Sequence, residues 1–290
     1  MKRTIQTKAA AILASACCGL FTTQTTAETC EFTGLVNNNW SENGNWDCGN
    51  APTSSDIAVI PNGKTCTLNG ADGDALQIII ETGGRLDIPK GSTLTLHGTG
   101  SDQEDSSVIN GKLRFVTGTG DDPELVIVQD HWIINTATPG VGDGIVGEVK
   151  GLIKGGSGDV LTIAHGVALS FLLSGHLEVQ TELSLYATLL VESGKTVTLN
   201  TYGKSGGGQI VVAGGTLEVD EEISGDLSLK ITSGTANLDA ECTALSGLIC
   251  VSGGTLNVNE SLCTTGNICY RGGSICVADG ATAIFSGTCP

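Results

Sequence analysis

Acidic side chains gather in two Gly-rich, loop-like segments, GTGSDQEDSSVING and TGTGDDPE. Carboxylate oxygens are the ligands that Ca²⁺ prefers in proteins. If the two segments lie one above the other in a stacked structure, they predict a calcium site formed by Asp102, Glu104, Asp105, Asp121 and Asp122. The alternative, which we favour, is that these residues are solvated loop tips.

A polysaccharide lyase on such a site would also need a basic residue to take a proton from the substrate. The candidates Lys112, Arg114, Lys150, Lys154 and Lys204 are scattered and recur at no fixed spacing. A hydrolase that resembles polygalacturonase should show an NTD segment, an Asp pair, Gly-His-Gly and Arg-x-Lys. Only the pair Asp121-Asp122 is present. The sequence therefore assigns no catalytic residue, and it favours a protein that is not an enzyme.

Two further kinds of site are poorly supported. His97, His131, His165 and His176 do not have the spacing of metal ligands. An ice-binding face would need stacked Thr-x-Thr pairs, one in each repeat. Five such pairs exist, beginning at Thr65, Thr93, Thr117, Thr136 and Thr196, but the intervals between them are too unequal to follow a repeat.

The N-terminal residues predict export. Lys2, Arg3 and Lys8 precede the apolar run AAAILASACCGLF and small residues at Thr25 and Ala27, as in a secretory signal peptide. We expect cleavage after Ala27, giving a secreted or cell-surface protein. Lipidation at Cys17 is the less favoured alternative. No other segment reaches the ~20 apolar residues that cross a bilayer.

The charge excludes some partners. The formal charge of the whole chain is −17, and loss of residues 1–27 removes three basic residues and no acidic one, which leaves −20. Such a chain repels nucleic acid and anionic lipid. An oligomeric state does not follow from these numbers.

The positions of the Gly turns reveal a repeat. Related phrases such as SGHLEV, GGTLEV and GGTLNV begin at residues 174, 193, 214, 233, 253 and 272, at intervals of 19, 21, 19, 20 and 19. An earlier member, GGRLDI, begins at residue 83. A fixed period of this size marks stacked units that bury their apolar faces against their neighbours.

Each unit is predicted to contain β-strands only. Apolar residues alternate after each turn, as at Leu217 and Val219, and β-branched runs such as GQIVVA precede it. The sequence thus predicts an all-β fold, a single right-handed parallel β-helix with coils of about 19–21 residues. We expect a cap and first strands at 28–70 and the β-helix at 71–290, with irregular loops at 98–158 and regular coils from 174. The Gly pairs would form turns that take positive φ and stack without Cβ clashes.

Nine Cys residues remain after the predicted cleavage, and in an exported protein they predict disulfides, with at least one thiol left over. The repeat aligns Cys242 with Cys263 and Cys250 with Cys269, so we predict those two pairs, and Cys276–Cys289 as a weaker third. Reduced Cys packed as small core residues are the alternative. The remaining candidates, for which no pairing is predicted, are Cys30, Cys48 and Cys66.

Trp40 and Trp46 are expected to cover the first coil rather than to bind sugar. The pattern W-x-x-x-x-x-W…P-x-x-x-D-x-x-x-I-P-x-G, which starts at Trp40, resembles the opening of secreted bacterial β-helix proteins of surface-adhesin type and of the G8 domain. The resemblance covers residues 37–98 and implies adhesion or contact with polysaccharide.

These observations favour an exported, non-catalytic structural or adhesive protein of the cell surface or extracellular space. Its expected partners are extracellular polysaccharide or cell-surface components, and Ca²⁺ is the only cofactor suggested. The alternative is a polysaccharide lyase or glycoside hydrolase that acts in the loops at 98–144.

Overall fold

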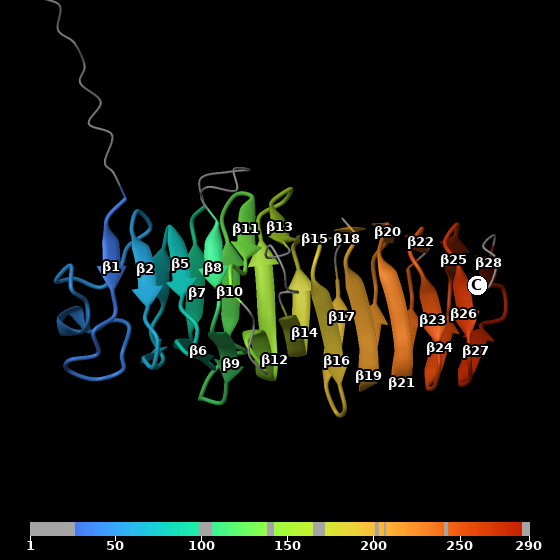
Figure 1. Ribbon diagram of the computed structural model, residues 1–290, viewed down its shortest axis with the longest axis horizontal. Helices are drawn as coiled ribbons and strands as arrows, with labels where there is room; N and C mark the ends of the chain where they lie inside the picture. The colour runs from blue at the N-terminus through green and yellow to red at the C-terminus, as the bar shows by residue number, and fades with distance from the viewer. Residues whose placement is uncertain are drawn as a thin grey trace, which may run out of the picture.

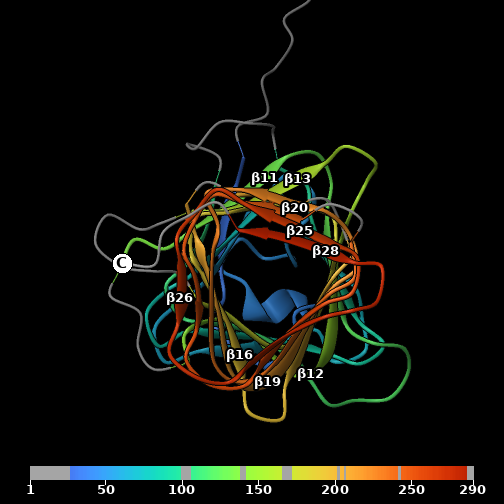
Figure 2. The ribbon, with the colours of Figure 1, turned by 90° about the vertical axis from the view of Figure 1, so that its right-hand side faces the viewer.

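The computed structural model describes residues 27–98, 106–137, 142–164, 172–200, 203–205, 207–240 and 243–285. These residues form an all-β structure in which every pairing between the named strands is parallel. The strands lie side by side along one axis, from β1 at one end to β28 at the other (Figure 1). Seen along that axis, they outline a closed ring (Figure 2).

One sheet has twelve strands and forms one side of the ring. Its strands, in their order in the sheet, are β1 (Thr29–Glu31), β2 (Ile57–Ile60), β5 (Gln77–Ile80), β8 (Ser107–Ile109), β11 (His131–Ile134), β13 (Val160–Ile163), β15 (Glu182–Leu185), β18 (Gly203–Ser205), β20 (Ile223–Gly225), β22 (Thr243–Leu245), β25 (Ser261–Thr264) and β28 (Thr282–Phe285).

The second sheet has sixteen strands and forms the other two sides. In chain order they are β3 (Thr65–Thr67), β4 (Gly73–Ala75), β6 (Arg85–Pro89), β7 (Thr93–Leu96), β9 (Lys112–Val116), β10 (Glu124–Ile127), β12 (Gly144–Gly155), β14 (Leu172–Gln180), β16 (Thr188–Glu192), β17 (Thr196–Leu199), β19 (Gln209–Val219), β21 (Ser228–Leu238), β23 (Ile249–Val251), β24 (Thr255–Val258), β26 (Ile268–Tyr270) and β27 (Ser274–Val277). The long strands β12, β14, β19 and β21 pair with one strand near their start and a different one near their end, so they turn the corner between the two sides.

Glycine allows these corners to stack. Gly234 has φ +84° and lies where the register of β21 against β19 shifts. A Cβ on Gly234 would lie 2.2 Å from the carbonyl oxygen of Gly215, and a Cβ on Gly254 (φ +77°) would lie 2.4 Å from that of Gly234. Only glycine fits both the backbone conformation and the space. The expected role of the Gly turns is therefore confirmed.

The coil length changes along the stack. In the twelve-stranded sheet, register partners from β15 onward have the spacing that the repeat predicts, as in Leu183 with Gly203 and Thr243 with Leu262. Before β15 the spacing is uneven and mostly wider, and His131 has Leu161 as its partner. The earlier coils are longer because extra residues connect their strands, while the strands themselves keep the same pairing.

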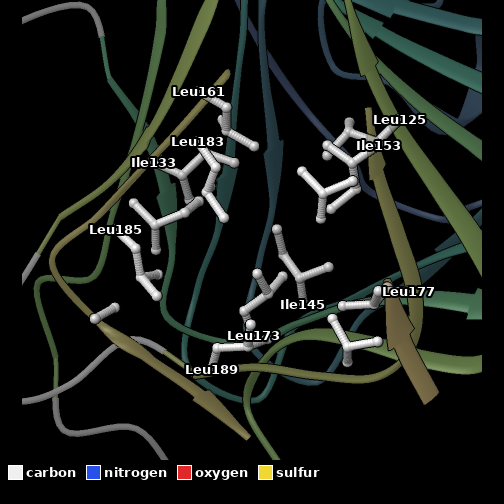
Figure 3. Packing of buried hydrophobic residues seen from close by; sticks show 14 of the residues in the cluster. Leu125, Ile133, Ile145, Ile153, Leu161, Leu173, Leu177, Leu183, Leu185 and Leu189 are labelled. Atoms are coloured by element: carbon white, nitrogen blue, oxygen red, sulfur yellow. The ribbon is translucent and has the colours of Figure 1, made fainter. Parts of the chain in front are cut away.

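The core lies inside the ring and consists of aliphatic side chains from all three sides. Figure 3 shows Leu161 and Leu183 of the twelve-stranded sheet facing Leu125 and Ile153 of the opposite side. On the third side, Ile145 and its register partners also point inward and are fully buried. Alternation at a period of two residues places one face of every strand in this core, which explains why the sequence alternates.

An aromatic cluster closes the N-terminal end. Trp40 and Trp46 are buried, with ring centroids 4.9 Å apart in an edge-to-face arrangement, and Phe32 packs against Trp46 at 5.2 Å. The indole N–H of Trp46 donates to the Trp40 carbonyl at 2.7 Å. Between these Trp residues lies a single 3₁₀ turn, η1 (Asn43–Asn45), seen at the far end in Figure 2.

A fixed loop belongs to this cap. The side-chain oxygen of the fully buried Asn45 accepts hydrogen bonds from the backbone N–H groups of Val36 and Asn37, both at 3.0 Å. Its side-chain amide donates to Asn37 Oδ1 at 2.9 Å and to the carbonyl of Asn39 at 2.8 Å. The four contacts of this one side chain determine the path of the loop.

The described cysteines form one disulfide, Cys30–Cys48, with Cα atoms 5.2 Å apart. It links β1 to the cap. Cys66 is a buried thiol, and burial raises its pKa well above the ordinary value. Cys250 and Cys269 are Cα partners on β23 and β26 but are not bonded in this structure. Their disulfide remains a prediction, and Cys242 and Cys289, needed for the other two, lie outside the described residues.

Candidate functional site

The predicted calcium site is only partly described. Asp102, Glu104 and Asp105 lie outside the described residues. Asp122 Oδ1 forms an ion pair with Lys90 Nζ at 2.9 Å, and the backbone carbonyl of Asp121 accepts from the Gly91 N–H at 2.8 Å. No group of three or more His, Cys, Asp or Glu side chains that could hold a metal occurs in the part of the chain that the structure describes.

The basic residues considered as catalytic bases are mostly held by carboxylates. Arg114 Nε donates to Asp87 Oδ1 at 2.8 Å, and its NH1 group donates to Glu148 Oε1 at 2.6 Å. The hydrogen bond to Asp87 raises the pKa of Arg114, so this guanidinium does not act as a base. Lys150 pairs with Glu178.

The other three candidate bases are Lys154, Lys112 and Lys204. Lys154 Nζ is 2.5 Å from Glu124 Oε1. Lys112 lies beside Arg85 as a register partner on β9 and β6. The side chain of Lys204 lies outside the description, although its backbone belongs to β18. The ion pairs of Arg114, Lys150 and Lys154 thus each join carboxylates of neighbouring coils.

The histidines serve separate local contacts. His97 Nε2 is 2.9 Å from Asp74 Oδ1, and His176 Nδ1 accepts from the Thr196 N–H at 3.2 Å. Burial, and secondly the charge of Lys195, lowers the pKa of His176. His165 lies outside the described residues.

His131 is the one described histidine inside the core. Its Nε2 atom is 2.8 Å from the hydroxyl of Ser107, which in turn accepts from the backbone N–H of Ile78 at 3.0 Å. Desolvation by burial lowers the pKa of His131 to about 4. A Ser–His pair buried at this depth cannot reach a substrate, so we treat it as part of the core.

A column of hydroxyl side chains runs along the outer face of the regular coils. Its members occupy the same register position in β17, β19, β21, β24 and β27 and are Thr196, Thr216, Thr235, Thr255 and Ser274. The four Thr side chains are half-buried and Ser274 is exposed. Adjacent members are ~4.8 Å apart along the stack because parallel strands have that spacing. Within the described residues their hydroxyls have no hydrogen-bond partner, so they are available to a ligand.

Two further polar columns lie beside the first. The second contains Thr198, Glu218, Asn237, Asn257 and Cys276. The third directly follows the strands and contains Asn200, Asp220, Asp239 and Asn259, whose backbone N–H groups continue the ladder of the preceding coil. We call these three columns the polar ladder.

Side-chain hydrogen bonds order the polar ladder from coil to coil. The amide of Asn237 donates to Glu218 Oε2 at 2.9 Å, and that of Asn257 donates to Asn237 Oδ1 at 2.7 Å. In the third column, Asn259 donates to Asp239 Oδ1 at 2.6 Å. These bonds hold the amides and carboxylates in one orientation before any ligand arrives, which reduces the entropy lost on binding.

The polar ladder is acidic at one place. Burial raises the pKa of Asp220, and the neighbouring charges of Asp239, Glu178 and Glu221 raise it further. The hydrogen bond from Lys150 is the main cause that lowers the pKa of Glu178. No Lys or Arg belongs to the three columns, so the ladder offers hydroxyls, amides and carboxylates to a ligand.

Sequence reasoning missed the first column because it searched for Thr-x-Thr pairs. Only Thr196 and Thr198 form such a pair on the ladder. The usable signal was a single Thr that follows each Gly turn or its equivalent, in KTVTLN, GTLEVD, GTANLD and GTLNVN. These four Thr residues recur with the same period as the Gly turns themselves.

Comparison with known proteins gives one partial match. A family model described as a domain of unknown function (DUF8693) matches residues 31–108, which include the cap and the first coils. The chain matches no curated protein and no solved structure. In the described residues there is also no helix of the length and apolar character that would cross a bilayer.

Proposed function

We propose that the chain is a single right-handed parallel β-helix and acts as an exported, non-catalytic structural or adhesive protein that contacts carbohydrate through the polar ladder. Parallel pairing throughout the named strands, a regular repeat from β15 onward and a common core support the β-helix. The basic and then apolar N-terminal segment of the sequence supports export to the surface or the medium.

The observation that carries the functional proposal is the column of Thr hydroxyls without partners among the described residues. Polysaccharides present hydroxyl groups at regular intervals along an extended chain. A rigid row of donors and acceptors, repeated every coil, can bind several sugar units at once, so weak contacts add up along the chain. The absence of Lys and Arg from the columns favours a neutral polysaccharide over an acidic one.

The resemblance of residues 37–98 to surface-adhesin openings agrees with this proposal. A lyase or hydrolase in the loops at 98–144 remains the competing function. Among its candidate bases, Arg114, Lys150 and Lys154 each contact a carboxylate, whereas Lys112 forms no ion pair within the described residues.

The test combines binding and cleavage in one experiment. Exported protein is presented to a panel of plant, algal and microbial polysaccharides, with and without Ca²⁺, and bound polysaccharide is measured by affinity electrophoresis. Released reducing and unsaturated ends are measured in the same samples. The variant Thr216→Val/Thr235→Val/Thr255→Val removes three hydroxyls and keeps the side-chain shape. The control Thr188→Val/Thr282→Val alters outward threonines on other faces.

We expect the triple variant to lose binding that the control retains, with equal melting temperatures. Binding that survives in the triple variant would remove the polar ladder from the proposal. Release of reducing or unsaturated ends from any polysaccharide would establish the enzymatic alternative.

A further inference from the structure

The last described coil of the stack exposes side chains at positions that point toward the core in the coil before it. Val277 occupies the inward column of Val258, yet it is 45 % exposed where Val258 is 0 % exposed. Tyr270 occupies the inward column of Val251 and is 55 % exposed where Val251 is 0 % exposed. The exposed fractions differ because each earlier coil lies between two neighbouring coils, whereas the last described coil has a described neighbour on one side only.

The backbone of this coil is incomplete in the same way. The strands β26, β27 and β28 each pair with one preceding strand, and no described strand covers their other edge. Open edges next to exposed apolar residues invite pairing with another chain.

The opposite end of the stack is closed. Phe32, Trp40 and Trp46 cover the core there. The outer edge of β1 is occupied by the cap, because the Glu31 N–H donates to Asp47 Oδ1 at 2.7 Å and the Asp47 N–H donates to the Glu31 carbonyl at 3.1 Å. The cap also covers β3, because Asn39 pairs with Thr67. Among the described residues, β4 (Gly73–Ala75) is then the one strand at this end without a partner on its outer side.

Charge also favours contact between two last coils. Residues 268–285 contain one basic residue, Arg271, and one acidic residue, Asp279, in a chain with a formal charge of −17. Contact through the sides of the stack would bring the acidic surfaces together, and contact with the cap would meet the acidic segment 28–47. The last coil is the electrically neutral end, so self-association there has the least repulsion to overcome.

We infer that two copies of this chain associate tail to tail through β26, β27 and β28, burying Tyr270 and Val277 in a symmetric dimer. In such a dimer each copy provides the covering layer that the other lacks. A two-fold axis makes the interface self-complementary, and this is the most common symmetry of protein oligomers. The dimer leaves the polar ladder free from Thr196 to Asn259 in both copies, and only its last members, Ser274 and Cys276, lie on the interface strand β27.

The experiment measures the mass of the exported chain by light scattering after gel filtration, over a hundredfold range of concentration. The variant Val277→Lys places a charge on the open end, where the side chain is already partly solvated. The matched control Val36→Lys changes a more exposed valine, 60 % exposed, at the capped end. Circular dichroism and melting curves of both variants establish that each is folded.

We expect the unmodified chain and Val36→Lys to be dimers and Val277→Lys to be a folded monomer. Small-angle scattering should give the dimer about twice the maximum dimension of the monomer, since the two stacks lie end to end. A monomeric unmodified chain at every concentration, a dimer that survives Val277→Lys, or an open series of higher oligomers would each overturn the tail-to-tail dimer.

Discussion

Cys250 and Cys269 are register partners on the neighbouring strands β23 and β26, one coil apart near the open end of the stack. Burial, and secondly the hydrogen bond and charge of the adjacent Cys269, raises the pKa of Cys250. Neighbouring parallel strands hold their Cα atoms within the range that a disulfide bridges.

We predict that this pair is oxidised in the exported protein. Closing a loop of this size should stabilise the chain by about 3 kcal/mol in the chain-entropy model. Peptide mapping under non-reducing conditions should find the Cys250–Cys269 bond. The double variant Cys250→Ser/Cys269→Ser should unfold at lower denaturant concentration. A map in which both residues are free thiols would contradict the prediction.

The Gly turns should be unequally sensitive to substitution. Gly254 and Gly194 precede equivalent strands, and both have positive φ, but only Gly254 has a backbone carbonyl in the place of an added Cβ. We expect Gly194→Ala to cost about 1 to 2 kcal/mol from the left-handed conformation alone. Gly254→Ala should cost more, because Gly234 must also move. If urea titrations show that both variants lose the same free energy of unfolding, then the close approach of the neighbouring coil does not require glycine at position 254.

Buried His131 should make stability depend on pH. The unfolded chain takes up a proton on this histidine below pH 6.5, whereas the folded chain, with its lowered pKa, does so only near pH 4. Stability from this residue is therefore fully present above pH 6.5 and is lost as the pH falls toward 4, by about 3 kcal/mol.

The variant His131→Gln removes this titration and keeps a polar group opposite Ser107. Its melting temperature should change less than that of the unmodified chain between neutral and mildly acidic pH. Parallel curves for the two proteins would mean that His131 is already solvated or protonated in the folded state.

Asp220 should have the opposite pH dependence. Because its pKa is raised in the folded chain, the folded state binds a proton more readily than the unfolded state, and its ionisation lowers stability as the pH rises. Asp220→Asn should therefore raise the melting temperature at neutral pH, and the gain should vanish at acid pH, where Asp220 is protonated. Glu260→Gln, an exposed change outside the polar ladder, serves as the control. A gain that persists at low pH would point to a cause other than charge.

Much of the architecture could be predicted from the order of residues. The spacing of the Gly turns predicted the coil length from β15 onward, and strict alternation around Leu217 and Val219 identified their inward positions. Both signals are local, because a strand exposes alternate residues to its two faces and a sharp turn needs a residue that accepts positive φ.

The sequence did not predict which polar residues of neighbouring coils lie side by side. The column from Thr196 to Ser274 contains one residue from each of five strands, so a search for Thr-x-Thr pairs within a strand does not find it. Its members are close only because the five strands align in register. The cation partners of Asp87, Asp122 and Glu178 include residues on other coils, far away along the chain.

Sequence by itself determined the β class, the period and the inward residues, since these depend on neighbours along the chain. Tertiary structure decided which polar side chains stand side by side, and that the last described coil stays uncovered while the first is capped. The physical reason is that a contact between coils depends on the lengths of all the connections between them.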